Sequence, residues 1–410
     1  MHPQRLIERK QYIQQLRDLK DQNIIKVVTG VRRCGKSTLL QMFAEELIRS
    51  GIEEAQVQFY NFEDLDTLAI GDIFQIHTHI KERLVSDSPN YIFLDEVQNI
   101  NEFQRLVDSL YIKPNVDVYI TGSNAYLLSG ELATLLTGRY VEINLLPLQF
   151  SEYYNYTTSK SPNLSKNDIL ANFLHFGGLP EYNKQLDIGE KQADKFAESI
   201  LNAIIEKDIF LRLGITNKYD FNKILDFVLD TVGSYVSPRS ISDTLRAHGT
   251  VVDKQTVAKY LDALCEAFLI YKVPRYEIKG KGLLQTLNKY YVVDPCFAKV
   301  RLKKAKKKDR SHWLENMVYL ELVRRNKEVF IGKRNNLEVD FVVVDNQDYT
   351  SYYQVAWTTE DAVTLERELA SLKAIKDSSP KYLLTTDMDF NPVYEGIRKL
   401  NVIEWMLSYY

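Results

Sequence analysis

The chain has 410 residues, of which 45% are hydrophobic and 26% charged, and its formal net charge is −3. This length predicts roughly two or three domains, and the nearly balanced charge excludes a polycation that coats nucleic acid. The three cysteines lie too far apart for a disulfide framework or a Cys-based metal pattern. No apolar run of about 18 residues is present, so a cytoplasmic protein without a membrane segment is expected.

A phosphate-binding loop is predicted near the start of the chain. Residues 24–29 form an apolar run typical of a buried strand, and residues 30–37, GVRRCGKS, match the pattern G-x-x-x-x-G-K-S/T between a strand and a helix. The glycines permit a backbone that directs N–H groups at phosphate oxygens. Lys36 is expected to reach the β- and γ-phosphates of ATP, and Ser37 to bind Mg²⁺. The predicted nucleotide-binding residues are Gly30, Arg32, Arg33, Gly35, Lys36, Ser37 and Thr38.

Two arginines, Arg32 and Arg33, lie inside this loop. The planar guanidinium suits either a phosphate or a carboxylate. One of them is therefore expected to face the nucleotide, and the other a carboxylate of a lid or of a neighbouring molecule. The sequence does not decide which arginine takes which role, and two solvated arginines are the alternative.

Polar residues follow two further buried strands. Asp95 and Glu96 end the apolar run YIFL, where Asp95 is expected to hold Mg²⁺ through water and Glu96 to polarise the attacking water. The strand at 116–121 is followed by Ser123 and Asn124, and either side chain is a candidate contact of the γ-phosphate and the attacking water. An ordinary polar turn is the alternative there.

Arg139 directly precedes another predicted strand. It is expected to act in trans on the γ-phosphate bound by a neighbouring copy, as an arginine finger, and this predicts a homo-oligomer. A structural ion pair is the alternative. The predicted catalytic residues are Glu96, Lys36, Arg139 and Asn124.

The predicted strands alternate with helical segments, which indicates an α/β fold with a parallel sheet covered on both faces. The nucleotide is expected at the carboxyl ends of the strands, where the motifs lie. The five strands are 24–29, 56–62, 91–95, 116–121 and 140–146.

The segments TGVRRCGKSTLL, FLDEVQNI, ITGSNAYLLSGELATLLTGRY, LLPLQFSEY and FGGLPEY follow one another in this order. With them the chain resembles a prokaryotic family of AAA+-type P-loop ATPases whose members carry a winged-helix and nuclease-like C-terminal half. The resemblance places the GGLPEY segment in a helical lid near the nucleotide. The expected domains are a P-loop NTPase core at 1–165, a lid at 166–230, a winged helix at 231–295 and a restriction-nuclease-like α/β domain at 296–410.

Two segments of the C-terminal half are candidate DNA contacts. Lys254, Gln255 and Lys259 lie at the exposed start of the second helix of a predicted helix-turn-helix. Many winged helices bind only protein, so a protein partner is the alternative. The stretch 299–310 carries eight Lys or Arg residues, which form either a solvated loop or a contact with the phosphate backbone.

The order of elements after residue 311 resembles a restriction-nuclease core, with Glu315 on a helix and Asp340 on a strand. Where such a core has Glu-x-Lys on the next strand, this chain has Gln354 and Ala356. A neutral amide is a poor substitute for an anionic metal ligand, so we expect the fold without the hydrolysis.

The sequence therefore predicts a Mg²⁺-dependent ATPase whose ATP hydrolysis is coupled to movement of the C-terminal half, with DNA as a candidate partner. The alternative is a slow nucleotide-dependent switch that acts through a protein partner. A third reading, a nuclease gated by ATP, is disfavoured by Gln354 and Ala356.

Overall fold

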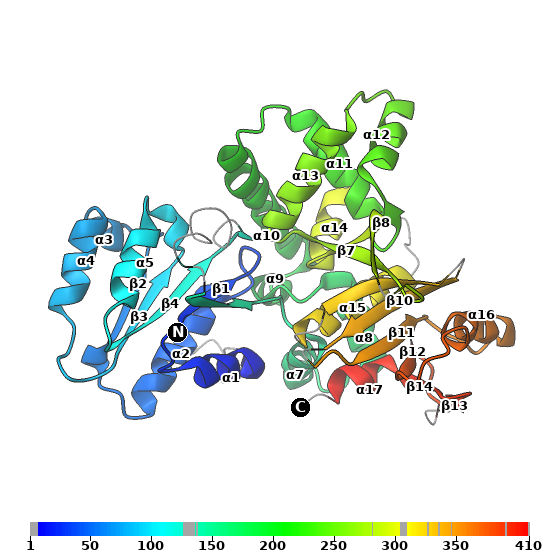
Figure 1. Cartoon of the computed structure of the whole chain (residues 1–410), viewed down its shortest axis with the longest axis horizontal. Coiled ribbons are helices and arrows are strands. Elements are labelled where there is room, and N and C mark those ends of the chain that lie inside the picture. Colours follow the sequence, from blue (N-terminus) through cyan, green and yellow to red (C-terminus); the bar gives the residue numbers. More distant parts are fainter. Residues whose placement is uncertain are drawn as a thin grey trace. The chain divides into compact units, whose positions relative to one another are not determined.

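The computed structural model describes residues 7–125, 136, 138–280, 282–303, 310–325, 328–334, 337–345, 347–389 and 392–408. The chain forms two compact units (Figure 1). The first consists of the chain up to Pro147 together with Glu266–Phe268, and the second of Leu148–Cys265 and Leu269–Tyr410. None of the helices in the described ranges is long and apolar enough to cross a membrane.

The first unit is built on a five-stranded parallel sheet with the strand order β2-β3-β4-β1-β5. The predicted fold class is confirmed, and each strand bound lies within two residues of the predicted one. The strands are β1 (Ile25–Thr29), β2 (Val57–Asn61), β3 (Asn90–Asp95), β4 (Val116–Gly122) and β5 (Tyr140–Asn144).

Helices cover both faces of this sheet, because successive side chains of a buried strand point to opposite faces. On one face, Ile92 and Leu94 of β3 join a core with residues of α4 and α5. On the other face, the ring of Phe93 lies 6.4 Å from that of Phe43 in α2. The helical segments are α1 (Lys10–Leu19), α2 (Lys36–Arg49), η1 (Glu54–Gln56), α3 (Leu65–Leu68), α4 (Ile73–Glu82), η2 (Val97–Asn99) and α5 (Phe103–Tyr111).

The second unit contains a nine-stranded mixed sheet with the order β13-β14-β12-β11-β10-β9-β7-β8-β6. This sheet runs across the expected boundary between residues 295 and 296, because β7 pairs in parallel with β9. The strands are β6 (Tyr235–Val236), β7 (Ile270–Glu277), β8 (Gly282–Val292), β9 (Glu328–Arg334), β10 (Leu337–Val344), β11 (Thr350–Val355), β12 (Lys381–Thr385), β13 (Val393–Tyr394) and β14 (Ile397–Asn401).

Helices of the second unit pack on this sheet, among them α15 and α16. The ring of Tyr319 in α15 stacks on Tyr291 of β8 at 4.6 Å, whereas Leu369 and Leu372 of α16 join a core with Val342 of β10. The helices are α7 (Phe150–Lys160), α8 (Lys166–Phe176), α9 (Pro180–Leu186), α10 (Glu190–Ala203), the π-helical η4 (Ile204–Leu211), α11 (Lys218–Asp230), α12 (Pro238–Ala247), α13 (Lys254–Glu266), α14 (Pro295–Leu302), α15 (Arg310–Arg324), α16 (Ala362–Lys373) and α17 (Val402–Leu407).

The two glycines of the GGLPEY segment allow a close approach inside the second unit. The Gly178 N–H donates to Asp294 Oδ2 at 2.7 Å. A Cβ at Gly177 would lie 1.8 Å from Asp294 Oδ1, and one at Gly178 would lie 2.4 Å from the Leu148 carbonyl oxygen. The same carboxylate accepts the N–H of Cys296 and so caps α14. The glycine pair is therefore required by packing, in addition to any role near a nucleotide.

Candidate active site

The predicted phosphate-binding loop connects β1 to α2. Gly30 has a φ of +143°, and a Cβ there would lie 2.3 Å from the carbonyl oxygen of Leu145, so glycine is required. Arg33 and Gly35 also have positive φ values, 67° and 106°. Left-handed residues in such a turn direct backbone N–H groups to one side. The N-cap residue of α2 is Gly35, which has no side chain to bond the first N–H groups, and these N–H groups together with the positive dipole end suit an anion.

Gly30→Ala is expected to lower the free energy of unfolding of the first unit by about 2 kcal/mol or more, because the methyl group would overlap a backbone oxygen. The matched control is Gly51→Ala, since Gly51 also has a positive φ, +103°, but nothing lies within 4 Å of its Cβ position. Gly51→Ala should lower the free energy of unfolding by only about 1 kcal/mol. Denaturation in urea measures the free energy of unfolding of both variants. Equal decreases in the two variants would contradict the steric explanation.

Lys36 is the first residue of α2 and is only 4% exposed. Its Nζ donates to the carbonyl oxygens of Gly30 at 3.2 Å and Val31 at 3.5 Å, and lies 3.5 Å from Glu96 Oε1. Burial lowers the pKa of Lys36, but the surrounding negative charges, of which Glu96 is the strongest, outweigh it and raise the pKa above its ordinary value. Lys36 is therefore a buried, charged ammonium group.

Asp95 ends β3 and is fully buried. The Thr121 hydroxyl donates to its Oδ1 at 2.6 Å. Burial raises the pKa of Asp95, and hydrogen bonding from Thr121 and from the Ser37 hydroxyl opposes this rise, which places Ser37 beside the carboxylate. Among the residues that the structure describes, Oδ2 of Asp95 has no hydrogen-bond partner. A free carboxylate oxygen next to a hydroxyl fits a hydrated Mg²⁺ ion, which prefers oxygen ligands and keeps several waters.

Glu96 follows with a left-handed φ of 54°, and its backbone N–H donates to Thr121 Oγ1 at 2.8 Å. Gln98 Nε2 donates to Glu96 Oε2 at 2.5 Å and to Ser123 Oγ at 3.3 Å. Burial raises the pKa of Glu96, but the charge of Lys36 and the hydrogen bond from Gln98 bring it below its ordinary value. Glu96 is therefore an ionised carboxylate.

Gln98 is a site residue that the sequence analysis missed. Its only signal is its place two residues after the acidic pair, which does not predict the contact with Ser123 just after β4.

Asn124 follows β4 and is 5% exposed. Its Oδ1 has no hydrogen-bond partner within the described ranges, and the same holds for Gln98 Oε1. Together with Asp95 Oδ2 they make three buried acceptors without a donor. A buried acceptor without a donor costs free energy, and ordered water is the usual partner of such groups. The site thus offers acceptors for water next to an ionised carboxylate.

The two loop arginines differ in their surroundings. Arg32 Nη1 lies 3.2 Å from Glu63 Oε1, a carboxylate of the same unit just after β2. The charge of Arg32 also contributes to the lowered pKa of Glu96, so this arginine faces the site. Arg33 is exposed. Thr38 lies in the first turn of α2 and is half-buried.

Arg139 lies at the end of the sheet where the parallel strands begin, whereas the phosphate-binding loop lies where they end. It precedes β5, whose first residue Tyr140 is paired in parallel with Ile25 at the start of β1. At about 3.3 Å per residue, the length of β1 separates this end of the sheet from the loop. Arg139 Nη1 lies 2.5 Å from Asp108 Oδ1, and its guanidinium lies 5.6 Å from the centre of the Tyr111 ring. The structure therefore does not bring Arg139 to the site of its own chain.

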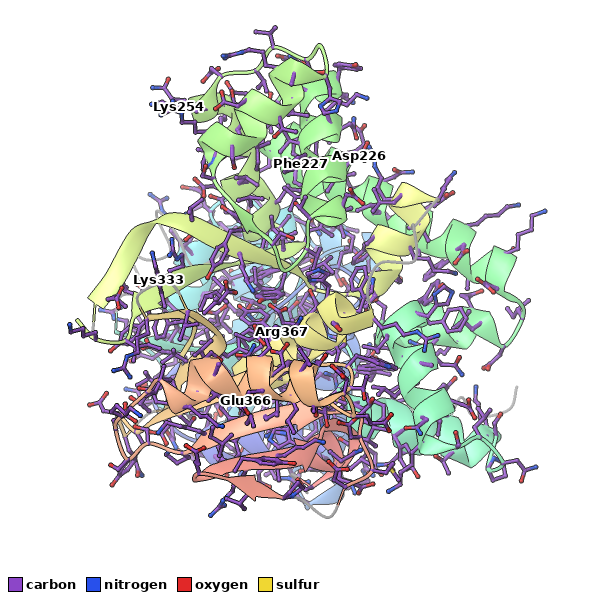
Figure 2. The ribbon with its side chains drawn as sticks, turned by 90° about the vertical axis from the view of Figure 1, so that its right-hand side faces the viewer. Asp226, Phe227, Lys254, Lys333, Glu366 and Arg367 are labelled. Carbon is purple, nitrogen blue, oxygen red and sulfur yellow. The ribbon has the colours of Figure 1, made fainter. Side chains whose placement is uncertain are left out.

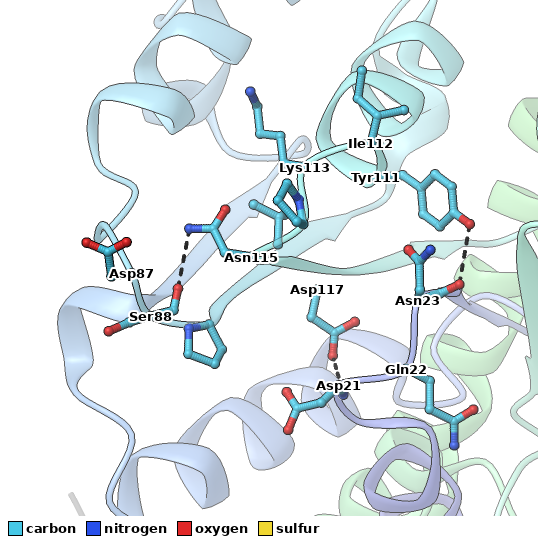
Figure 3. Close-up of a pocket in the computed structure, with 13 residues that line it drawn as sticks. Asp21, Gln22, Asn23, Asp87, Ser88, Tyr111, Ile112, Lys113, Asn115 and Asp117 are labelled. Atoms are coloured by element: carbon cyan, nitrogen blue, oxygen red, sulfur yellow. Dashed lines mark hydrogen bonds between the residues drawn. The ribbon is translucent and has the colours of Figure 1, made fainter.

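A cavity of about 620 Å³ opens at the same end of the sheet, where the strands begin (Figure 3). The Asp21 N–H donates to Asp117 Oδ2 at 3.0 Å, and the Tyr111 hydroxyl donates to the Asn23 carbonyl oxygen at 3.3 Å. None of the residues predicted from the sequence lines this cavity. The cavity and the phosphate-binding loop are separate places on the first unit.

Comparison with known proteins agrees with this geometry. A family model described as an AAA domain matches residues 22–154, and a model described as a domain of unknown function matches residues 167–309. An uncharacterized protein of Haemophilus influenzae is 35% identical over 404 residues, which cover 98% of this chain and 99% of that protein. The chain belongs to the same family as this protein. Residues 22–154 match an AAA domain and contain the parallel sheet of the P-loop ATPase fold, which confirms the predicted fold class, whereas these two family models lend no support to a nuclease-like C-terminal half.

The chain is also similar to two further proteins. An uncharacterized protein of Methanocaldococcus jannaschii is 29% identical over 397 residues, covering 93% of this chain and 85% of that protein. The structure of a Walker-type ATPase of Pyrococcus abyssi has 16% sequence identity and a TM-score of 0.49, covering 72% of this chain and 96% of that chain.

Proposed function

We propose that the site between β1, β3 and β4 binds ATP with Mg²⁺ and hydrolyses it. The observation that carries this proposal is the free Oδ2 of Asp95 beside Ser37, with the ionised Glu96 next in the chain. Ser37 and Asp95 would hold the ion, which supplies positive charge against the phosphates when bound. Glu96 would accept a proton from the attacking water, and Asn124 would help to orient that water.

Lys36 would exchange partners on binding. In the structure its ammonium group is hydrogen-bonded to two carbonyl oxygens of its own loop and paired with Glu96. A triphosphate in the loop would be a stronger partner for this ammonium than a neutral carbonyl oxygen. Because the charge of Lys36 lowers the pKa of Glu96, drawing Lys36 toward the phosphates would make Glu96 a stronger base.

A slow nucleotide-dependent switch is the second candidate function. One observation favours it: Glu96 is held at once by Gln98 and by Lys36, and a carboxylate so engaged is poorly placed to take a proton. On this reading ATP binding changes the conformation that a protein partner recognises, and hydrolysis only resets it. We propose that in either case the C-terminal half responds to the nucleotide.

DNA as a partner rests on two sets of residues. Lys254, Gln255 and Lys259 are exposed, and Figure 2 shows Lys254 on the outer side of α13. In the basic stretch, Lys299 Nζ lies 2.6 Å from Asp194 Oδ1. In the same stretch Arg301 pairs with Asp226 at 2.5 Å and Lys303 with Glu198 at 2.9 Å, and residues 304–309 lie outside the described ranges. The start of α13 is thus the better candidate for a DNA contact.

The test of the proposed function is ATP turnover by the purified protein, with and without single- and double-stranded DNA, at two salt concentrations. Turnover that DNA stimulates and that salt suppresses would support a DNA-coupled ATPase. Turnover that DNA does not change would still support ATP hydrolysis, and it would indicate that the partner is a protein. ATP binding with negligible turnover under every condition would favour the switch, and absence of ATP binding would contradict both.

Arg139 gives a sharp test of the proposed homo-oligomer. If Arg139 completes the site of a neighbouring copy, Arg139→Ala should lower turnover by about 10²-fold. Mixing it with the Glu96→Gln variant, for which an even larger loss is expected, should restore part of the activity, because each variant supplies what the other lacks. The matched control is Asp108→Asn, which breaks the same ion pair and should leave turnover within about fivefold. No recovery on mixing, with an equal loss in Asp108→Asn, would show that Arg139 serves only the ion pair.

A further inference from the structure

A second group of buried charges lies in the second unit. Glu315 of α15 and Asp340 of β10 are each only 8% exposed, and the structure brings them together. Burial and then the charge of Glu315 hold the pKa of Asp340 well above its ordinary value. Glu338 lies two residues before Asp340 on the same strand, and its charge also raises the pKa of Asp340. Three carboxyl groups thus gather beneath α15.

Lys289 of β8 lies among these carboxyl groups and is 5% exposed. Its Nζ lies 2.9 Å from Glu315 Oε1 and 2.7 Å from Glu338 Oε1. Burial lowers the pKa of Lys289, but the charges of Glu315, Asp340 and Glu338 outweigh it and raise the pKa above its ordinary value. The Tyr291 hydroxyl donates to the same Glu315 oxygen at 2.5 Å. This ammonium is therefore a permanent positive charge with close carboxylate partners.

One oxygen of Asp340 and the side chain of the neighbouring Gln354 are already engaged. Asp340 Oδ2 accepts the Val355 N–H at 2.8 Å. Gln354, which stands where a metal-binding carboxylate is wanted, accepts the Asp340 N–H at 3.3 Å and donates to Glu368 at 2.9 Å. Within the described part of the chain, no group of three or more His, Cys, Asp or Glu side chains is arranged to hold a metal ion. The residues do not fit the metal that a nuclease of this kind needs.

We infer that the Lys289 ammonium takes the place of a divalent cation among Glu315, Glu338 and Asp340, and that this cluster is closed to metal. A divalent ion of the Mg²⁺ or Mn²⁺ class would need these same carboxylate oxygens. It would also have to lie beside a fixed positive charge, where Coulomb repulsion is strong because the surroundings are buried. A second buried cation lies near Lys289, since both Arg275 and Lys289 lie over the ring of Tyr235, at 5.1 and 5.4 Å.

The inference predicts that a metal site opens when the ammonium is removed. In Lys289→Ala, three carboxyl groups would lose their cation, and Mn²⁺ should bind at least about tenfold more tightly than to the parent protein, because a divalent ion would neutralise the stranded charges. Mn²⁺ should also raise the unfolding temperature of this variant. The measurement is Mn²⁺ binding by electron paramagnetic resonance, in the absence of nucleotide, together with thermal unfolding with and without Mn²⁺.

Two variants control this experiment. Lys289→Ala/Asp340→Asn should lose the gained ion, and Lys272→Ala, which removes an exposed lysine of β7, should behave like the parent. A further comparison does not depend on whether Lys289→Ala folds. The parent protein and the single variant Asp340→Asn should bind Mn²⁺ equally. Mn²⁺ binding by the parent that is lost in Asp340→Asn would overturn the inference. A folded Lys289→Ala that gains no ion would overturn it as well.

Discussion

Lys36→Ala is expected to abolish ATP binding at micromolar nucleotide and to lower turnover by about 10³-fold. The side chain is an ammonium group, 4% exposed, at the start of a helix whose N-cap residue is a glycine. In such a buried place one positive charge interacts with phosphates much more strongly than in water. Titration with a fluorescent ATP analogue measures the binding, and phosphate release measures the turnover.

The control for this change is Lys81→Ala, which removes an exposed lysine of α4 in the same unit and should change neither quantity. Because Lys36→Ala also leaves Glu96 without its positive partner, thermal unfolding of the variant must be compared with that of the parent. A folded Lys36→Ala that binds ATP within a few-fold of the parent would mean that the loop does not hold the triphosphate.

Glu96→Gln is expected to keep ATP binding and to lower turnover by about 10³-fold, since a general base contributes roughly 10² to 10⁴. Glutamine has nearly the same size and keeps an oxygen that can accept the Gln98 hydrogen bond, but it cannot take a proton from water. The pKa of Glu96 is below its ordinary value, so the parent base is ionised at neutral pH. At ATP concentrations well below saturation, where the rate reports the free enzyme, turnover should therefore be lost only as the pH falls below the ordinary range of a glutamate, about 4.

Glu102→Gln is the matched control for this prediction. Glu102 lies six residues further along the chain, also has a left-handed φ, 58°, and pairs with Arg105 at the surface. Its replacement should leave turnover unchanged. A Glu96→Gln variant that hydrolyses ATP at the parent rate would assign the base to another group, whereas one that no longer binds ATP would make Glu96 a binding residue.

The strands and the loop of the first unit could be predicted because their signals are local. An apolar run followed by GVRRCGKS fixes a strand, a turn and a helix within about twenty residues. The partners of the side chains depend on chain segments far apart in the sequence. The pairing of Arg32 with Glu63 spans 31 residues and that of Arg139 with Asp108 also 31, so the sequence left the roles of these arginines open.

In the C-terminal half, side-chain partners also come from distant segments, and the sequence predicts even fewer of them. Glu315 and Asp340 were singled out by their order along the chain, and the structure brings them together. Lys289 was missed, because a single lysine in the segment LNKYYVV carries no motif. Lys289 meets its carboxylate partners only when β8 joins the sheet that contains β10 and lies under α15. A lysine within a run of aromatic and apolar residues is the one signal that the sequence offered.

The parallel pairing of β7 with β9 determines how this protein can be divided for experiments. A fragment that ends near residue 295 would keep β7 but lose β9, and the bare strand edge would be free to pair with other copies and aggregate. A fragment that begins at residue 296 would retain Glu315 and Asp340 without Lys289, and would then carry buried carboxylates lacking their counter-charge. Expression trials aimed at the C-terminal half should therefore start near Leu148 and keep the whole sheet.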